Sequence, residues 1–248
     1  MKVALINSPW WVRYCPPYLL ASLSTFLKKN NHTPFCFDLN NLLYHEIDEE
    51  YKKFWDDRDY YSYWENSSFI EKLFEKIKLE NYIKKILDTQ AKIFVFNTHT
   101  TSVESSLIIS KIIKQSDKNN IIIFVGHKCS RAQMAFDFIK FPFVDYVCTG
   151  EIELALINLL KKLEKNKNFA TLPECKGFLV KKNNEIIDCG NPEVVKDLDT
   201  LPFADYDDFY YEIKNDLYSQ PNRLDILNSR GCINACHFCY ERLYWQKF

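Results

Sequence analysis

The amino-acid sequence predicts an α/β protein whose sheet is parallel and doubly wound, in the flavodoxin-like manner. Along residues 1–165, short apolar runs alternate with segments in which apolar residues recur at helical spacing. The runs end at polar residues or glycines, where loops are expected to leave the carboxyl ends of buried strands. With 248 residues, 47% hydrophobic and 16% aromatic, the chain can form a packed core.

The apolar runs give the expected strands in chain order. They are residues 3–7, 35–38, 93–97, 121–125 and 145–148. The principal helices are expected to begin after residues 16–17, two prolines that a first helical turn tolerates, and to cover 103–115 and 151–165. Lysines at 28–29 end the first helix, where positive charge is favourable.

A flavodoxin-like sheet places its first and third strands side by side, and ligands bind at the strand carboxyl ends near this point. The loops that leave those ends are residues 8–18, 98–102, 126–130 and 150–151. A Rossmann nucleotide-binding domain is a poor alternative because no G-x-G-x-x-G follows the first strand. We therefore expect the binding site of this domain among these loops.

Residues 46–88 are expected to form a helical insertion in the domain. The segment is highly charged and rich in aromatic residues, with acids as common as bases. Stacking of these aromatic side chains on nucleic-acid bases is the alternative interpretation. Packing of the aromatic residues against one another is favoured, because the charges balance and residues 69–87 contain apolar residues at helical spacing.

Residues 166–223 are interpreted as a connector, and residues 224–248 as the start of a second domain. Two short β-type runs on either side of Asn183-Asn184 predict a hairpin within the connector. Residues 224–228 predict the first strand of a (β/α) barrel, whose carboxyl end delivers a loop rich in cysteine.

That loop holds Cys232, Cys236 and Cys239 in a C-x3-C-x2-C spacing. Three thiolates so close in sequence suit a [4Fe-4S] cluster whose fourth iron stays open to another ligand. A closed zinc site wants four ligands and would have to recruit His237, and three unconnected thiols are the other alternative. The cluster is favoured because spacing, flanking residues and position after a strand agree. The remaining cysteines are scattered and are expected to be free, as in a reducing cytosol.

The same loop resembles the radical S-adenosylmethionine (SAM) superfamily, in which an aromatic residue, here Phe238, precedes the last cysteine. The preceding Ser229-Arg230-Gly231 resembles the cobalamin-binding branch of that superfamily. The resemblance implies that the open iron binds the amino and carboxylate groups of SAM, with the chain around Phe238 against its adenine. It also implies reductive cleavage of SAM to methionine and a 5′-deoxyadenosyl radical, with an electron donor of flavodoxin or ferredoxin type.

Residues 1–165 resemble the cobalamin-binding domain that precedes the radical SAM core in this branch. The matching features are Pro16-Pro17 with its helix, the strand end Asp38-Leu39-Asn40, the polar loop at 97–102, Gly126, and Val144-Asp145-Tyr146-Val147 with the Gly150-Glu151 that follows. The D-x-H-x-x-G signature, whose histidine ligates cobalt in the wider class, is absent. Cobalamin is therefore an expected cofactor, and the way it binds is left open.

The candidate cobalamin contacts lie at the strand ends: Asn97, Thr98, His99, Gly126, His127, Gly150 and Glu151. By the resemblance, residues 97–99 stand where the wider class has S-x-L, and residues 126–127 stand where it has a glycine pair. For each histidine, a hydrogen-bonded loop residue is the favoured interpretation, and a cofactor contact or cobalt ligand is the alternative.

The resemblance predicts a cobalamin-dependent radical SAM enzyme, with methyl transfer to an unactivated carbon as the favoured reaction. Cyclisation and rearrangement are alternatives within the branch, and a non-catalytic corrinoid- or iron–sulfur-binding module is the hypothesis outside it. The substrate, a small molecule or a peptide, leaves no signal in the sequence. A barrel takes ~250 residues, and residues 230–248 alone follow Ser229, so the chain is expected to be the front part of a longer enzyme.

The net charge of −1 gives no bulk electrostatic attraction to nucleic acids or membranes. No apolar run is long enough for a membrane-spanning helix, and the apolar part of the N-terminus is too short for a signal peptide. A cytoplasmic protein without nucleic-acid or membrane partners is expected.

Overall fold

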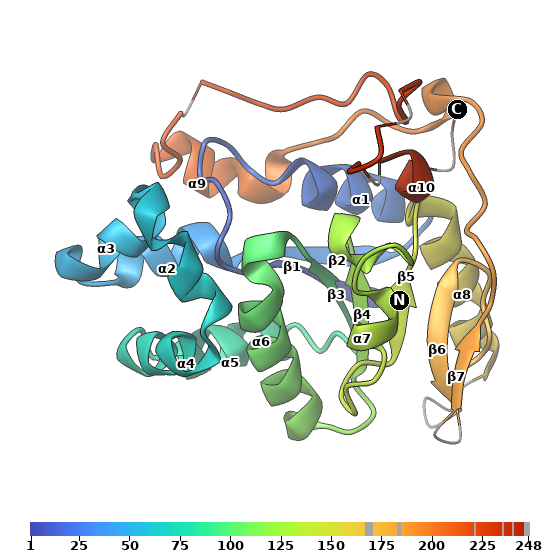
Figure 1. Ribbon diagram of the computed structural model, residues 1–248, viewed down its shortest axis with the longest axis horizontal. Helices are drawn as coiled ribbons and strands as arrows, with labels where there is room; N and C mark the ends of the chain where they lie inside the picture. The colour runs from blue at the N-terminus through green and yellow to red at the C-terminus, as the bar shows by residue number, and fades with distance from the viewer. Residues whose placement is uncertain (167–170, 183–184, 221, 235, 240, 246–248) are drawn as a thin grey trace.

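The computed structural model describes residues 1–166, 171–182, 185–220, 222–234, 236–239 and 241–245. In this part of the chain, one sheet has the strand order β2-β1-β3-β4-β5-β6-β7 (Figure 1). The parallel strands are β1 (Lys2–Asn7), β2 (Thr33–Asp38), β3 (Ile93–Asn97), β4 (Ile121–Val125) and β5 (Tyr146–Cys148). Their order, 2-1-3-4-5, is the flavodoxin-like order, so the predicted fold class is confirmed.

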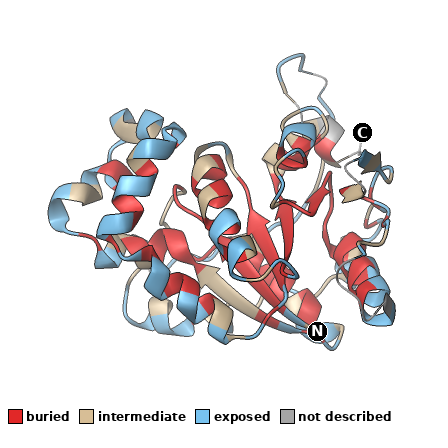
Figure 2. Ribbon diagram, turned by 90° about the horizontal axis from the view of Figure 1, so that it is seen from below, coloured by how far each residue is buried: buried red, intermediate tan, exposed pale blue. Residues whose placement is uncertain are grey.

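The central strands are apolar throughout because both faces of the sheet are covered. Successive side chains of a strand point to opposite faces. One face receives Phe94, Phe96, Ile122 and Phe124, and the other receives Ile93, Val95, Ile121, Ile123 and Val125. Figure 2 shows these buried strands between helices that are exposed on their outer sides.

Helices from different parts of the chain cover the two faces. On one face, α1 (Tyr18–Lys29) and α8 (Glu153–Asn166) contribute leucines to the core. On the other face, α6 (Val103–Ser116) contributes Ile109 and Ile113, and the short α7 (Ala135–Phe138) contributes Phe138. The expected helices are thus present, and α1 begins directly after the proline pair and ends at the lysine pair.

The predicted helical insertion is also present, and it begins earlier than expected. It comprises α2 (Leu39–Glu46), α3 (Glu49–Asp56), a 3₁₀ segment (Arg58–Glu65), α4 (Ser67–Lys76) and α5 (Leu79–Asp88). The helix starts at Leu39 because the carboxylate of Asp38 accepts a hydrogen bond from the Asn41 main-chain N–H. Trp55 and Trp64 are buried, and each indole N–H has a hydrogen-bond acceptor, so this packing accounts for the aromatic content.

The hairpin of the connector is confirmed, although its turn at Asn183-Asn184 lies outside the described residues. Its strands, β6 (Phe178–Lys182) and β7 (Glu185–Asp188), are antiparallel, and β6 pairs with β5. The hairpin therefore extends the sheet beyond the five predicted strands. The rest of the connector contains two 3₁₀ turns (Leu198–Thr200 and Asp207–Phe209) and α9 (Tyr210–Lys214).

Residues 224–228, which were expected to form a barrel strand, form no strand in the structure. A strand depends on hydrogen bonds to a neighbouring strand, and none of the described strands lies beside this segment. The segment runs past Tyr18 instead, with Ile226 exposed to solvent, and it leads to the short α10 (Glu241–Trp245). Figure 1 shows this C-terminal segment in red, crossing over α1. None of the described helices combines the length and the apolar character that crossing a bilayer requires.

Candidate functional site

A cavity of about 340 Å³ lies at the carboxyl ends of the parallel strands. One wall comes from the loops after β3, β4 and β5 and from the start of α1, and the other wall comes from the segment around the cysteine motif. The lining residues of the second wall are Leu227, Ser229, Arg230, Gly231, Glu241, Tyr244 and Trp245. Residues that are distant in sequence therefore meet at the edge where parallel α/β sheets bind ligands.

A row of hydrogen-bonded polar side chains lies at the ends of the first three strands, and one of them, Asn97, lines the cavity. Asn7, Asp38 and Asn97 are neighbours in the sheet register because all three end their strands. Asn7 Nδ2 donates to Asp38 Oδ1 at 2.9 Å, and Asn97 Nδ2 donates to Asn7 Oδ1 at 3.4 Å. The Tyr218 hydroxyl, from the connector, donates to Asp38 Oδ2 at 3.1 Å. Burial raises the pKa of Asp38 to about 6, although these hydrogen bonds favour its ionised form.

His99 extends this row into the cavity as a neutral ring. Its Nε2 lies 2.9 Å from Asn97 Nδ2 and accepts the amide hydrogen, which places the ring proton on Nδ1. Its ring stacks on Trp11 with the centroids 3.7 Å apart and the planes 14° apart. Burial lowers the pKa of His99 to about 3, and the charge of nearby His127 contributes a smaller part of this shift. The ring is therefore uncharged at neutral pH and fixed in orientation.

Trp11 holds its position because the helical insertion binds the loop after β1. Asn40 forms two hydrogen bonds with Trp11: its side-chain oxygen accepts from the Trp11 N–H at 3.1 Å, and its amide donates to the Trp11 carbonyl at 2.8 Å. The Asn40 oxygen also accepts from the Trp55 indole at 3.0 Å. Trp10 donates its own indole N–H to the Trp55 carbonyl at 2.9 Å.

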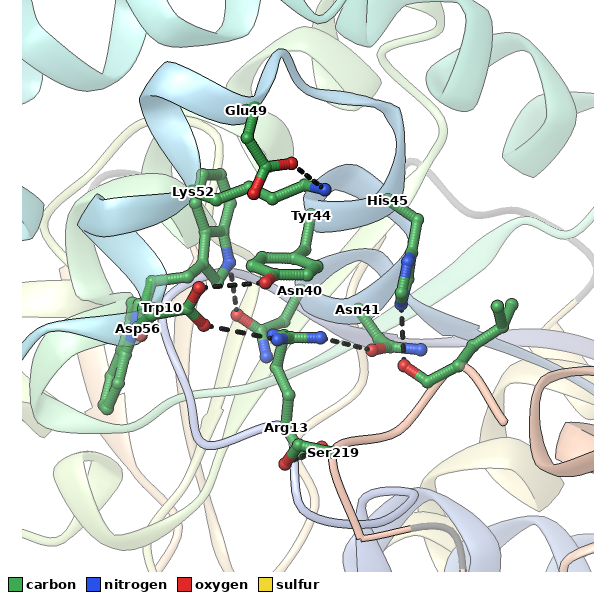
Figure 3. Close-up of polar contacts among 12 residues, drawn as sticks. Trp10, Arg13, Asn40, Asn41, Tyr44, His45, Glu49, Lys52, Asp56 and Ser219 are labelled. Atoms are coloured by element: carbon green, nitrogen blue, oxygen red, sulfur yellow. Dashed lines mark hydrogen bonds and ion pairs between the residues drawn. The ribbon is translucent and has the colours of Figure 1, made fainter. Parts of the chain in front are cut away.

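Arg13 forms a second connection between this loop and the insertion (Figure 3). Its guanidinium lies over the Tyr44 ring, 3.1 Å from the centroid, and forms an ion pair with Asp56 at 3.3 Å. Asp56 also accepts a hydrogen bond from the Tyr44 hydroxyl at 2.9 Å. The loop after β1 is thus attached to α2 and α3 on both sides of Trp11.

Gly126 begins the loop after β4, and its backbone conformation explains why a glycine stands there. Its φ of 106° and ψ of 178° fall in a region that side chains rarely allow. A Cβ atom at this position would lie 2.6 Å from the Thr98 carbonyl oxygen. Thr98 is itself 0% exposed, and its hydroxyl donates to the Val125 carbonyl and contacts Cys129 Sγ. Thr98 therefore joins the β3 and β4 loops, with its side chain turned away from the cavity.

His127 contacts the C-terminal helix across the cavity. Its Nδ1 lies 3.3 Å from Glu241 Oε1, and its ring meets Tyr244 edge-on, with the centroids 4.7 Å apart. Tyr244 is buried, and this burial raises its pKa well above the ordinary value. Through these contacts, α10 covers the loop after β4.

Arg230, two residues before the first motif cysteine, forms ion pairs with two carboxylates of the α/β domain. Its guanidinium lies 3.1 Å from Glu151 Oε2 and 2.5 Å from Glu153 Oε1. Burial alone would lower the pKa of Arg230, but Glu153 and Glu151 raise it above its ordinary value. The guanidinium also lies over the Trp245 ring, 5.3 Å from the centroid.

The motif cysteines lie beside the cavity and do not line it. Cys232 and Cys239 are half-buried and Cys236 is exposed, and none of the three forms a disulfide. Within the described ranges, no group of histidine, cysteine or acidic residues is arranged to hold a metal ion. The donor set nevertheless fits an iron–sulfur cluster, because three unpaired thiols in one short loop are the ligands that a cluster takes. Phe238 is 90% exposed next to them.

The structure brings most of the candidate cobalamin contacts together. The cavity is lined by Asn97, His99, Gly126, His127 and Glu151, whereas Thr98 and Gly150 are not among its lining residues. Phe238, the residue expected beside the adenine of SAM, does not line it either. Sequence reasoning did not identify Trp11, Tyr218 or Tyr244 as parts of this site. Nothing in the local pattern marks Tyr218 and Tyr244, because their partners are distant in sequence. Trp11 could have been suspected, since it is an aromatic residue in the first loop of the binding edge.

No protein-family model matches the chain. Two curated proteins named anaerobic magnesium-protoporphyrin IX monomethyl ester cyclase are similar to it in sequence. The protein from Cereibacter sphaeroides is 22% identical over 185 residues, which are 73% of this chain and 29% of that protein. The protein from Synechocystis sp. is 24% identical over 133 residues, which are 52% of this chain and 25% of that protein.

Among solved structures, the chain matches the cobalamin-dependent S-adenosylmethionine radical enzyme OxsB, determined with aqua-cobalamin bound. The TM-score is 0.58 at 18% sequence identity, and the match covers 86% of this chain and 25% of OxsB. The chain thus spans less than a third of the length of each of these proteins. The resemblance drawn from the sequence motifs is confirmed at the level of fold: the chain folds like part of a cobalamin-dependent radical SAM enzyme.

Proposed function

We propose that the chain is the cofactor-binding portion of a cobalamin-dependent radical SAM enzyme. The observation that carries this proposal is the shared cavity. Strand-end residues of the α/β domain and the Ser229–Gly231 segment that leads into the cysteine motif line it together. Methyl transfer to a substrate radical would require the reacting atoms to approach to about 3–3.5 Å, so the two cofactors and the substrate between them must share one space.

Cobalamin is assigned to the strand-end side of this cavity. Neutral His99, held in place by Asn97, offers the N–H of its Nδ1 there, and Gly126 leaves the backbone accessible. Because His99 Nε2 already accepts from Asn97, this nitrogen is not available to ligate cobalt unless that hydrogen bond breaks. A cavity of about 340 Å³ is too small to enclose a corrin macrocycle. Its binding therefore requires α10 to move away from His127.

The iron–sulfur cluster is assigned to Cys232, Cys236 and Cys239, and SAM to its open iron with Phe238 beside the adenine. The exposed position of Cys236 and Phe238 leaves this loop free to close around a cluster, since metal binding and folding of the ligand loop are coupled. When bound, these cofactors would supply a substrate radical and a methyl group for it. A flavodoxin- or ferredoxin-type protein would supply the electron.

Methyl transfer to an unactivated carbon is the reaction we propose first. Radical cyclisation is the second candidate, because both curated relatives are named as cyclases. In either reaction the site would have to exclude water from the radical, and on the strand-end side the His99 ring, held by its stacking on Trp11, forms part of the wall.

The gene product that carries this chain tests the proposal after anaerobic reconstitution with iron, sulfide and hydroxocobalamin. We expect about four irons per chain, lost in Cys236→Ala and retained in Cys189→Ala, a cysteine outside the motif. Methyl-deuterated SAM then separates the reactions, because methyl transfer places the label in the product and cyclisation does not. Iron that survives Cys236→Ala would contradict the cluster assignment, and binding of both cofactors without SAM cleavage would indicate a non-catalytic module.

A further inference from the structure

Arg230 is the point at which the cysteine segment is attached to the α/β domain. Its side chain is 4% exposed, and its partners Glu151 and Glu153 are 1% and 4% exposed. The partners precede Arg230 by 79 and 77 residues and stand between the end of β5 and the first turn of α8. The attachment is therefore long-range and almost fully shielded from solvent.

Other segments of the chain converge on the same charges. Glu151 Oε2 also accepts a hydrogen bond from the Val195 main-chain N–H at 2.9 Å, which brings in the connector. Trp245 of α10 lies against the guanidinium. The end of β5, the connector, the cysteine segment and α10 are thus held around one arginine.

Buried ion pairs of this kind contribute to position more than to stability. Taking three charges out of water is costly, and well-packed apolar residues of the same volume often stabilise a protein as much. A guanidinium presents several N–H groups in a fixed planar arrangement, so it can bind two carboxylates and define a direction as well as a distance. The arrangement thus specifies where residues 229–232 lie.

We propose that Arg230 is a positioning residue that fixes the cysteine loop, and hence the cluster, at a defined place beside the strand-end cofactor site. The inference rests on the proposed function for its cofactors and on the geometry of Arg230, Glu151 and Glu153 for the attachment itself. Loss of the attachment keeps the three motif cysteines and the strand-end residues Asn97, His99 and Gly126, and it separates the two groups.

Hydrogen–deuterium exchange of the cofactor-free 248-residue chain tests the attachment. In Arg230→Met, two protected regions beside the anchor are expected to exchange roughly tenfold faster or more, because this segment opens locally when its anchor is removed. They are the Cys239 amide, which donates to the Cys236 carbonyl at 3.1 Å, and the amides of α10, whose Trp245 packs on the guanidinium. In Arg230→Lys the increase should be smaller, since one ammonium cannot bind both carboxylates in the same planar geometry. Glu153→Gln is a milder variant that keeps the arginine and Glu151.

Arg131→Met is the matched control, because the ion pair that Arg131 forms is with Asp188 of β7, at 2.5 Å. It should leave exchange at Cys239 and α10 unchanged. Combining Arg230→Met with Glu153→Gln should add little to Arg230→Met alone, as expected for two residues in one interaction. Unchanged exchange in both Arg230→Met and Glu153→Gln, or equal loosening in Arg131→Met, would overturn the proposal.

Reconstituted gene product extends the test to the cofactors. Arg230→Met should retain the iron and cobalamin content of the wild type and lose kcat by roughly tenfold or more, at unchanged KM for SAM, because alignment is lost and SAM binding is not. An unchanged kcat would contradict the positioning role. If wild type binds neither cofactor, the proposed function fails, while the exchange experiment still decides whether Arg230 anchors the loop.

Discussion

The substitution Gly126→Ala should destabilise the fold through a steric overlap that can be read from the structure. The added Cβ would lie 2.6 Å from the Thr98 carbonyl oxygen, closer than real Cβ atoms approach. Thr98 cannot readily shift, because its main-chain N–H donates to the Val125 carbonyl at 2.8 Å. The backbone conformation at φ 106° and ψ 178° adds a cost of its own.

The magnitude follows from these two contributions. A side chain in this glycine-only region costs ~1–3 kcal/mol, and weakening the Thr98 hydrogen bond to relieve the overlap costs ~0.5–1.5 kcal/mol more. Replacing glycine by alanine recovers ~0.4–1 kcal/mol from the unfolded chain. The net loss in the free energy of unfolding is therefore expected to be ~2 kcal/mol, within a range of ~0.5–4 kcal/mol.

Gly190→Ala is the matched control. Gly190 also has a positive φ, 80°, but a Cβ there would meet no atom within 4 Å. The expected loss in the free energy of unfolding is the cost of ~1–2 kcal/mol for a side chain at positive φ. The ~0.4–1 kcal/mol that alanine recovers from the unfolded chain is subtracted from it. Urea unfolding followed by far-UV circular dichroism gives both free energies, with equal m-values as the check on comparability. Equal destabilisation by the two substitutions would refute the steric argument.

Three further predictions test the site. Between pH 6.5 and about 3 the unfolded chain binds more protons at His99 than the folded chain, so His99 makes the free energy of unfolding rise with pH by up to ~1.4 kcal/mol per pH unit. His99→Phe should remove this part of the pH dependence, as urea titrations across the range would show. An unchanged pH dependence would show that His99 titrates normally in the folded protein. In the iron-free protein at pH 7.5, iodoacetamide should modify exposed Cys236 well before Cys148, whose pKa burial raises to about 12, as peptide mass spectrometry would show; equal rates would contradict this burial. Tyr244→Ala should lower the Kd for hydroxocobalamin about three- to tenfold in absorbance titrations, because the edge-on contact with His127 no longer has to be broken. Weaker binding by this variant would instead indicate that Tyr244 contacts the cofactor.

The parts of the fold that follow from local patterns were predictable. β3 and β4 match the apolar runs 93–97 and 121–125 because a parallel strand covered on both faces has a nearly continuous apolar sequence. The hairpin was predictable as a hairpin, but its pairing with β5 was not, because the choice of a neighbouring strand lies outside the local sequence. The strand expected at 224–228 illustrates the converse, since β-type residues alone do not create a pairing partner.

The candidate site divides in the same way. Asn97, Gly126 and Glu151 could be placed at one edge because parallel strands end together. The attachment of Arg230 to Glu151 and Glu153 could not, because it joins positions almost 80 residues apart. The gathering of three thiols around a metal also depends on the metal, so spacing predicts the ligands but not the loop conformation.

The way Asn40 holds Trp11 has a consequence for exchanging parts between related proteins. The residue that stacks on His99 belongs to the loop after β1, but its main-chain N–H and carbonyl are both bonded by a side chain of α2. A chimera that receives residues 8–17 from another protein and keeps its own helical insertion still offers Asn40 a main-chain N–H and carbonyl. It loses the side chains of Trp10 and Arg13, which bond the Trp55 carbonyl and Asp56, and with them part of the attachment that places the ring stacked on His99. Residues 8–17 and 39–56 should therefore be exchanged together. A change in cofactor or substrate preference made through this loop would require matching changes in the insertion.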